Sequence, residues 1–430
     1  MELSRFTVTK KVAENRVALF NTHTKALVSI PSERLRDLNN GEGPLEIREN
    51  LERLGILVHS REQEFKDFLN FYETIQHSGH VGIWLYLTSD CNLGCPYCYQ
   101  GLDKPEIKLN RFVVKKLVEK IKELQNPYDE KSLTVTFYGG EPLLNKEVLD
   151  KTLDIFNDEF REMPRNYYMI TNGTKLNNIS EVKRWREKGL NGLQITLDGT
   201  KEEHDSRRIR LEGKNKGTFD EILNNIQLAK DFIPVDIRIN YDEGNVDQIS
   251  TVIDILKDKK LNVDNISINF AAIFDSDRSD YADEQSLTSA KDEIGYLDSL
   301  MRYANDKGFN VAMGFEGPCT IRNFSGLVVY PNGDLYSCPG MSGIPDYKWG
   351  NVFTKIDYKR QKEIVYEGIY PECKTCPVLP VCAGGCEWEE IVQTGKQGRH
   401  CDYTNLMRKV KLHIEHKIDF ENGVSTFTQV

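Results

Sequence analysis

The chain has 430 residues, of which 39% are hydrophobic and 28% are charged, so it can bury sizeable cores and suits two or three domains. Lysine and arginine total 56 against 66 aspartate and glutamate, and the net charge of −10 argues against nucleic acid as the main partner. The N-terminus lacks the apolar core of a signal peptide, and the longest strongly apolar stretch, Val81 to Leu87, is too short to span a bilayer. We therefore expect a soluble cytoplasmic protein without a membrane partner.

The first 80 residues carry the pattern of a small module of their own. Arg16 to Asn21 and Ala26 to Ile30 alternate like two strands of a hairpin, and Gly55 to Val58 indicates a further short strand. Helical patterns open at Pro31 and Pro44, and an amphipathic helix is predicted from Arg61 to Gln76. This mixture predicts a winged-helix-like α+β module over residues 1–80.

Residues 81–310 alternate strand-like and helical runs. The predicted strands are Ile83–Leu87, Leu133–Tyr138, Tyr167–Thr171, Gly192–Leu197, Val235–Asn240 and Ile266–Phe270. The predicted helices between them include Arg111–Leu124, Lys146–Phe160, Phe219–Phe232 and Val246–Lys259. A regular β-then-α repeat predicts parallel strands with right-handed crossovers, and six units suit an α/β fold of the partial (β/α)6, TIM-like barrel type. In such folds the functional site lies at the carboxyl ends of the strands.

The ten cysteines fall into two groups. Three lie from Cys91 to Cys98, and the other seven lie from Cys319 to Cys401 in a segment of short strands and turns, predicted as a cysteine-rich domain over residues 311–430. In a chain without an export signal, ten cysteines suggest metal or cluster ligation in preference to disulfides. The distribution implies two separate sites.

The first group, Cys91, Cys95 and Cys98, offers three thiolates in one loop just after a predicted strand. A structural zinc or a closed four-iron cluster normally takes four protein ligands, so three suggest a four-iron cluster with one iron open to an exogenous chelator. A zinc site with a distant fourth ligand is the alternative.

This CxxxCxxC segment, with an aromatic residue before the last cysteine, resembles the signature of the radical S-adenosylmethionine (radical SAM) superfamily. The resemblance implies a catalytic [4Fe-4S] cluster whose open iron binds the amino and carboxylate groups of S-adenosylmethionine. It also implies that an electron from the reduced cluster cleaves the cofactor to methionine and a 5′-deoxyadenosyl radical, and that an external low-potential donor such as flavodoxin or ferredoxin supplies that electron. The cofactor carries the difficult chemistry.

Further positions match the family's cofactor-binding motifs. Gly139-Gly140-Glu141-Pro142 resembles the GGEP motif, in which the backbone and Glu141 would receive an ammonium group; a simple strand-to-helix turn is the alternative. Tyr97 would stack near adenine. Thr196, Asp198 and Arg208 resemble the stretch after the fourth strand, where polar side chains reach the ribose and an arginine pairs with the methionine carboxylate, although Arg207 and Arg210 lie close enough to compete for that role. Asn172, Asp198 and Asn240 each end a strand and could equally be turn or capping residues.

The second cysteine group resembles the SPASM extension of radical SAM enzymes, with every cysteine of its pattern present, although spacing alone also permits a zinc ribbon. The resemblance implies two auxiliary [4Fe-4S] clusters, which makes three in all. One would be held by Cys373, Cys376, Cys382 and Cys401, and the other by Cys319, Cys338 and Cys386. The second set is one ligand short, so that its fourth iron would be open or held by a neighbour such as Glu316.

The predicted N-terminal module resembles the peptide-recognition element of enzymes that mature ribosomally made peptides, which would bind the leader of a precursor peptide as an added strand. An unrelated dimerisation or packing domain is the alternative. We therefore expect a leader-dependent peptide maturase that abstracts a hydrogen and installs a crosslink, with a Cys-derived thioether as the leading outcome. Carbon–carbon crosslinking, epimerisation and sulfatase maturation remain open, as does a non-catalytic iron–sulfur or zinc protein acting in electron transfer or binding. Sulfatase maturases place an Asp where this chain has Pro339.

Overall fold

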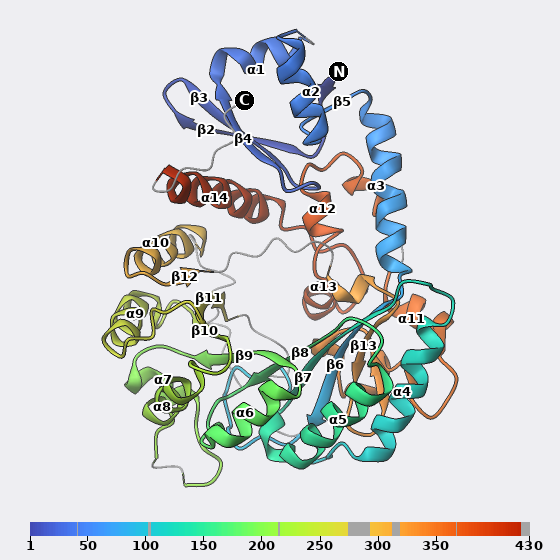
Figure 1. Ribbon diagram of the computed structural model, residues 1–430, viewed down its shortest axis with the longest axis vertical. Helices are drawn as coiled ribbons and strands as arrows, with labels where there is room; N and C mark the ends of the chain where they lie inside the picture. Colours follow the sequence, from blue (N-terminus) through green and yellow to red (C-terminus); the bar gives the residue numbers. More distant parts are fainter. Residues whose placement is uncertain are drawn as a thin grey trace. The chain divides into compact units, whose positions relative to one another are not determined.

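The computed structural model describes residues 1–40, 42–101, 105–213, 216–273, 293–311, 319–366 and 368–422 (Figure 1). The chain divides into two compact units. The first unit joins residues 1–77, 313–322 and 366–430, and the second joins residues 78–312 and 323–365. The segment between residues 274 and 292 lies outside the described part, as do residues 312–318, which include Glu316.

The second unit is built on a ten-stranded sheet in the order β12-β11-β10-β9-β8-β7-β6-β13-β14-β15. Neighbouring strands from β6 to β12 run parallel, as the βα alternation predicts. The parallel strands are β6 (His80–Thr88), β7 (Ser132–Gly139), β8 (Arg165–Thr171), β9 (Leu190–Leu197), β10 (Val235–Tyr241), β11 (Ile266–Ala272) and β12 (Asn310–Val311). All six predicted strands are present, and the α/β partial-barrel prediction is confirmed.

Helices cover one face of this sheet, as Figure 1 shows. They are α4 (Arg111–Gln125), α5 (Lys146–Glu159), α6 (Ile179–Glu187), α7 (Lys201–Arg207), α8 (Phe219–Ala229), α9 (Ile249–Asp258) and α10 (Glu293–Asp306). Alternate strand residues that point toward the helices are apolar and buried, for example Val235, Ile237 and Ile239 on β10. The residues between them point to the opposite side, which we call the inner face of the sheet, and it is there that polar side chains can reach a ligand.

One part of the sheet was not predicted from the sequence. Strand β13 (Gly326–Val329) pairs in parallel with β6, and β14 (Asp334–Tyr336) and β15 (Gly350–Asn351) extend the sheet in antiparallel fashion. Helix α11 (Tyr358–Ile364) follows within the same unit. The segment that carries Cys338 is therefore continuous with the barrel sheet.

The first unit contains a three-stranded antiparallel sheet of β2 (Thr7–Ala13), β3 (Arg16–Asn21) and β4 (Leu27–Pro31). One face packs on α1 (Ser32–Asn39) and α2 (Leu45–Arg53) through Leu19, Ile30 and Leu51. The other face packs on α14 (Tyr403–Asn422) through Phe20 and Ile414. Strands β1 (Glu2–Leu3) and β5 (Leu57–Val58) form a separate pair. The predicted hairpin and helices of this module are present.

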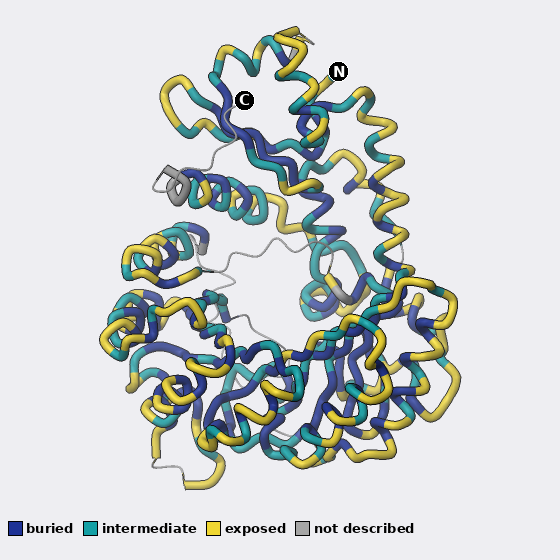
Figure 2. The backbone as a smooth tube through the Cα atoms, in the orientation of Figure 1, coloured by how far each residue is buried: buried dark blue, intermediate teal, exposed yellow. Residues whose placement is uncertain are grey.

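The rest of the first unit is the cysteine-rich segment with α3 (Arg61–Gln76), α12 (Leu379–Cys382) and α13 (Glu387–Thr394). Phe6 and Phe68 pack against Cys373 and Leu379, so residues from both ends of the chain share one apolar cluster. Figure 2 shows how buried and exposed positions are distributed along the backbone. Among the described helices, none combines the length and apolar character that crossing a membrane requires.

Candidate active site

The first cysteine group lies in the loop that follows β6, where Cys91, Cys95 and Cys98 are each partly exposed. Burial raises the pKa of Cys95 to about 12, the Arg208 guanidinium acts against this, and negative charge on Cys91 or Cys98 would raise the pKa further. The sulfurs of Cys91 and Cys98 are thus close enough to Cys95 to oppose its ionisation. A cluster of three thiolates would be stable here only with added positive charge, which iron supplies. The residues fit a cysteine-bound cluster.

Within the described residues, no group of three or more His, Cys, Asp or Glu side chains is arranged to hold one metal ion. In an iron–sulfur cluster each cysteine binds its own iron, so the ligands do not need to converge on one point. For both cysteine groups, the choice between a cluster and a single zinc ion stays a prediction.

The backbone of Gly140 and Glu141 joins the end of β7 to the cysteine loop. The amide of Gly140 donates to the carbonyl of Thr88 at 2.9 Å, and the amide of Glu141 donates to the carbonyl of Asp90 at 2.8 Å. Asp90 immediately precedes Cys91. The predicted GGEP segment therefore holds the backbone that leads into the first cysteine.

Glu141 is completely buried and its carboxylate connects β7 to the end of β8. One oxygen accepts hydrogen bonds from the amide of Leu143 at 2.9 Å and from the Thr171 hydroxyl at 2.7 Å, and the other accepts from the amide of Asn172 at 2.7 Å. Burial raises the pKa of this carboxyl group, and these hydrogen bonds act against that rise. Pro142 begins the turn of 3-10 helix that follows. Binding of an ammonium group at Glu141 stays a prediction.

Asn172 lies against the first cysteine. Its side-chain amide donates to Asn92 at 2.9 Å and lies 4.0 Å from the sulfur of Cys91. Asn92 in turn donates to the hydroxyl of Thr174 at 2.9 Å. The cysteine loop and the end of β8 are therefore tied by side-chain hydrogen bonds as well as through Glu141.

A second network lies at the ends of β9 and β10, around the completely buried Asp198. Its carboxylate accepts hydrogen bonds from the hydroxyl of Tyr97 and, at 2.9 Å, from the side chain of Asn240. Arg208 donates to the Tyr97 hydroxyl at 3.0 Å and lies 3.4 Å from the Asp198 carboxylate. Four residues that the sequence singled out one by one are thus brought together beside the cysteine loop.

Arg208 has different hydrogen-bond partners from the neighbouring arginines in the chain. Arg207 pairs with Asp242 at 2.7 Å and also with Glu203, whereas Arg210 pairs with Glu221. Among these three arginines, Arg208 is the one bound to the Tyr97–Asp198 network. The structure therefore favours Arg208 over Arg207 and Arg210 as the arginine of the site.

Several residues of the site were not predicted. Gln100 donates to the carbonyl of Gly139 at 2.9 Å, and Thr171 holds Glu141. His204 accepts from the amide of Asp198 at 3.3 Å. Their signal in the sequence is weak, because each is a polar residue next to a motif whose partner is set by the fold. Thr196 lies on the inner face of β9, where its side chain has no hydrogen bond to the described residues.

In the cysteine-rich segment, burial raises the pKa of Cys373, Cys376 and Cys382, and charge on the other cysteines of this set raises it further. Cys401 is among those neighbours. The four predicted ligands are therefore gathered within the first unit. Arg399 approaches Cys373 and Cys401 as a hydrogen-bond donor, and its charge acts against the rise in the pKa of Cys373.

The other predicted set is divided between the units. Burial raises the pKa of Cys386 to about 11, and charge on Cys319 adds to the rise, so these two cysteines are neighbours in the first unit. Cys338 belongs to the second unit, where it lies near Tyr86. The shared cluster of these three cysteines stays a prediction, and Glu316, its suggested fourth ligand, lies outside the described residues.

Comparison with known proteins identifies the barrel. The radical SAM superfamily matches residues 85–257. The chain is 24% identical over 399 residues to the radical SAM cyclopropyl synthase TigE of Paramaledivibacter caminithermalis, covering 79% of each protein. It is 25% identical over 331 residues to a cysteine-type anaerobic sulfatase-maturating enzyme of Clostridium novyi, covering 70% of this chain and 85% of that enzyme.

Solved structures have the same fold. The enzyme anSMEcpe with bound AdoMet has a TM-score of 0.62 at 19% identity, covering 80% of this chain and 96% of that one. Streptococcus suis SuiB bound to its precursor peptide SuiA has a TM-score of 0.54 at 14% identity, covering 93% of this chain and 98% of that one. Residues 85–257, with the cysteine loop and the GGEP segment at the carboxyl ends of their strands, are therefore identified as a radical SAM domain.

Proposed function

We propose that this enzyme matures a ribosomally made precursor peptide and is guided by the peptide's leader. The observation that carries the proposal is a sheet with an open edge next to an apolar pocket in the first unit, in a chain that also contains the radical SAM domain. The similarity to SuiB, a structure solved with its precursor peptide, supports a peptide substrate.

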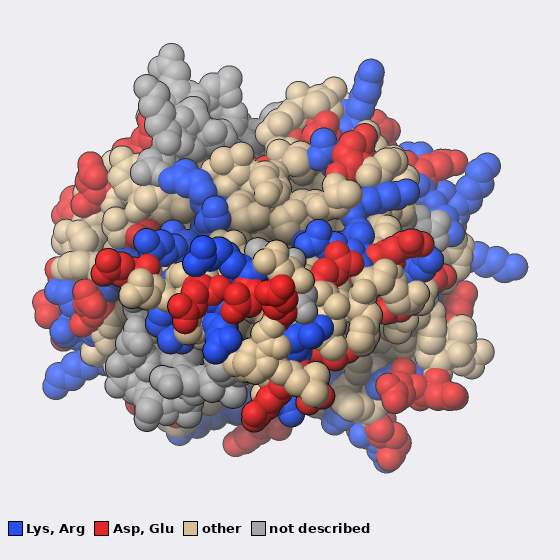
Figure 3. All heavy atoms as spheres, turned by 90° about the horizontal axis from the view of Figure 1, so that it is seen from above, with Lys and Arg blue, Asp and Glu red and all other residues tan. Residues whose placement is uncertain are grey.

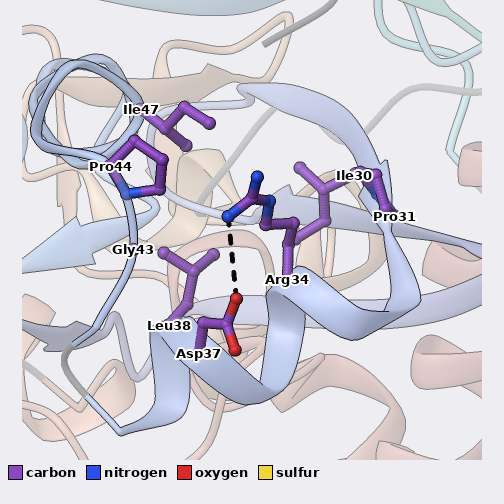
Figure 4. Close-up of a pocket in the computed structure, with 8 residues that line it drawn as sticks. All are labelled: Ile30, Pro31, Arg34, Asp37, Leu38, Gly43, Pro44 and Ile47. Carbon is purple, nitrogen blue, oxygen red and sulfur yellow. Dashed lines mark ion pairs between the residues drawn. The ribbon is translucent and has the colours of Figure 1, made fainter.

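The proposed leader site begins at β4. Within the described residues this strand pairs only with β3, so its other edge can accept an added strand. Beside the end of β4 lies a pocket of ≈ 210 Å³ (Figure 4). Its apolar lining comes from Ile30, Leu38 and Ile47, and an ion pair of Arg34 and Asp37 at 3.7 Å lies beside them. Main-chain pairing along β4 would give affinity, and an apolar leader side chain in the pocket would give specificity.

Charge is a weaker candidate for leader recognition. On the face drawn in Figure 3, acidic and basic side chains are interspersed. A mixed surface produces a smaller long-range field than a patch of one sign. We therefore assign specificity to the strand edge and the pocket.

At the active site, a bound cluster and S-adenosylmethionine supply the 5′-deoxyadenosyl radical. Cys91, Cys95 and Cys98 would hold the catalytic cluster, and Tyr97, Asp198 and Arg208 would position the cofactor beside it. The two sets of C-terminal cysteines would hold two auxiliary clusters, which makes three. A flavodoxin or ferredoxin would deliver the electron.

For the product, we propose a Cys-derived thioether. Forming it removes two hydrogens from the peptide: one hydrogen atom goes to the 5′-deoxyadenosyl radical, the thiol proton goes to solvent, and one electron goes to an auxiliary cluster as acceptor. The precursor peptide encoded beside the gene, incubated with reconstituted enzyme, S-adenosylmethionine and dithionite, should lose the mass of two hydrogen atoms for each crosslink. A crosslink that survives when the peptide's cysteines are changed to alanine would instead favour carbon–carbon bond formation.

The leader site is tested by filling the pocket. Ile47→Trp should weaken binding of the fluorescently labelled precursor peptide by about 10-fold or more, because the pocket would no longer admit a leader side chain. Leu45→Trp is the matched control, since Leu45 lies on the same helix but is 67% exposed and does not line the pocket. Equal affinities for the two variants and the parent would contradict the assignment of the leader to this site.

A further inference from the structure

The inner face of β9, β10 and β11 carries polar side chains in rows across the strands. The row farthest from the carboxyl ends of the strands consists of Gln194, Asp236 and Ser267, which are partners in register. Gln194 donates to the Asp236 carboxylate at 2.8 Å, and Ser267 donates to its other oxygen at 2.9 Å. This row is therefore closed by its own hydrogen bonds.

In the row at the carboxyl ends of the strands, the polar side chains also bond to one another. Asn240 donates to Asp198 at 2.9 Å, and this carboxylate also accepts from Tyr97, as described above. The row between the two differs. It consists of Thr196, Arg238 and Asn269, which are also partners in register.

Arg238 has a single hydrogen bond, from its Nε to Asn240 at 2.9 Å, and no carboxylate within 4.0 Å among the described residues. The buried arginines of this structure provide a contrast, because Arg207, Arg208 and Arg322 each have a carboxylate partner. Arg238 is only partly buried, and none of its nitrogens is sealed from solvent without a partner. Among the described residues, neither terminal NH₂ group of its guanidinium therefore has a hydrogen-bond acceptor.

The surroundings of Arg238 suit an anion. Asn269, beside it on β11, also has no side-chain hydrogen bond to the described residues and can add an amide donor. Burial raises the pKa of Tyr138 on the neighbouring part of the inner face, and the charge of Arg238 acts against that rise, so the guanidinium lies within electrostatic reach of β7. A planar guanidinium whose two NH₂ groups have no partner among the described residues matches the geometry of a carboxylate.

We propose that Arg238, assisted by Asn269, binds a carboxylate on the inner face, two residues before Asn240 on β10. Two sources have this chemistry: the α-carboxylate of S-adenosylmethionine and an acidic side chain of the substrate peptide. The second source rests on the proposed peptide substrate, whereas the first does not. Loss of a charge-assisted hydrogen bond to a carboxylate weakens binding by about 10- to 100-fold.

The test compares Arg238→Gln and Arg238→Lys in the reconstituted enzyme by isothermal titration calorimetry. Arg302→Gln on α10 is the control, because it removes an exposed arginine that pairs with Asp298 at 2.8 Å on the helix side of the sheet. One arm titrates S-adenosylmethionine and decarboxylated S-adenosylmethionine. The other arm titrates acetyl-Gly-Glu-Gly-amide and acetyl-Gly-Gln-Gly-amide into enzyme saturated with the cofactor. Arg238→Lys keeps the positive charge but loses the two parallel N–H donors of the guanidinium, so its affinity should lie between those of the parent and Arg238→Gln.

If Arg238→Gln weakens S-adenosylmethionine by about 10- to 100-fold but leaves its decarboxylated form unchanged, the carboxylate is the cofactor's. If the cofactor binds normally but the preference for the Glu peptide over the Gln peptide disappears, the carboxylate belongs to the substrate. The proposal is overturned if neither arm changes. It is also overturned if both cofactor forms weaken equally, as a role limited to orienting Asn240 predicts. Each of these measurements is a binding affinity. They can therefore be interpreted even if the enzyme does not catalyse the proposed maturation reaction.

Discussion

Gly139 and Gly140 allow the cysteine loop to lie directly against the end of β7. Gly139 has a φ of +143°, and a Cβ atom at Gly140 would lie 2.2 Å from the carbonyl oxygen of Asp90. Backbone atoms cannot yield to such a contact as a flexible side chain can. Close packing of the backbone therefore requires glycine at these two positions of the GGEP segment, whether or not they contact a cofactor.

We predict that Gly140→Ala displaces Asp90 and with it Cys91, lowering both the iron content and the melting temperature of the reconstituted protein. The expected loss of stability is about 1–3 kcal/mol, typical of overpacking at a close contact. Gly82→Ala on β6 is the matched control, because its new Cβ would have no neighbour closer than 3.9 Å. Parent-like iron content in Gly140→Ala would show that the loop tolerates the displacement.

His204 makes the stability of the second unit depend on pH. Burial lowers its pKa to about 4, and its ring nitrogens contact the Asp198 amide and, at 3.0 Å, the Thr218 hydroxyl. The unfolded chain, with an ordinary histidine pKa near 6.5, binds this proton more readily. The free energy of unfolding therefore falls as the pH drops from about 6.5 toward 4.

Between pH 7 and pH 5 this one group should cost about 2 kcal/mol of stability. We predict that His204→Gln, which can still bond to Thr218, shows a smaller drop in urea-unfolding free energy over that range than the parent. His59→Gln, a substitution at a side chain that is 76% exposed, should keep the parent's drop. An equally steep pH dependence in His204→Gln would assign the effect to other groups.

At the level of elements, α14 completes the N-terminal sheet. Val410 and Ile414 are fully buried against Val8, Ala18 and Phe20, on the face opposite α1 and α2. Lys10 on β2 also pairs with Glu415 at 2.5 Å. A sheet with two apolar faces cannot be stable with one face in water, so the last helix of the chain is needed for the fold of the first strands.

We predict that Ile414→Ala lowers the free energy of unfolding of the first unit by about 2–4 kcal/mol, through lost burial and a residual cavity. Limited proteolysis should then cleave the N-terminal strands faster, while Lys417→Ala, at an exposed position of the same helix, should match the parent. Unchanged protection of residues 1–31 in Ile414→Ala would mean that α14 adds little to this sheet.

Local pattern predicted most elements, because βα alternation and hairpin periodicity are properties of neighbouring residues. It did not predict the pairing of β13 with β6 or the packing of α14 on β2, since both join segments hundreds of residues apart. The active site likewise has features that local sequence indicates and features that depend on contacts between distant segments. Motifs located the cysteine loop and the GGEP segment, whereas the partners of Arg207, Arg208 and Arg238 depend on side-chain directions that only the folded sheet fixes.

Across the whole molecule, the two complete cysteine groups lie in different compact units. Cys91, Cys95 and Cys98 belong to the second unit, and the group that includes Cys373 and Cys376 belongs to the first. Their ligands come from separate loops, each supported by its own core. Iron loading at one group should therefore be independent of the other.

We predict that replacing Cys91, Cys95 and Cys98 together with alanine abolishes formation of 5′-deoxyadenosine but retains roughly two thirds of the iron of the three-cluster protein. Replacing Cys373 and Cys376 should instead lower the stability of the first unit, because Cys373 is packed with Phe6 and Phe68, while the catalytic group keeps its iron and its affinity for S-adenosylmethionine. Iron analysis, electron paramagnetic resonance and calorimetry measure these results. Loss of all iron in the first variant would mean that the groups share a site, and continued cleavage of the cofactor would refute the assignment of the catalytic cluster.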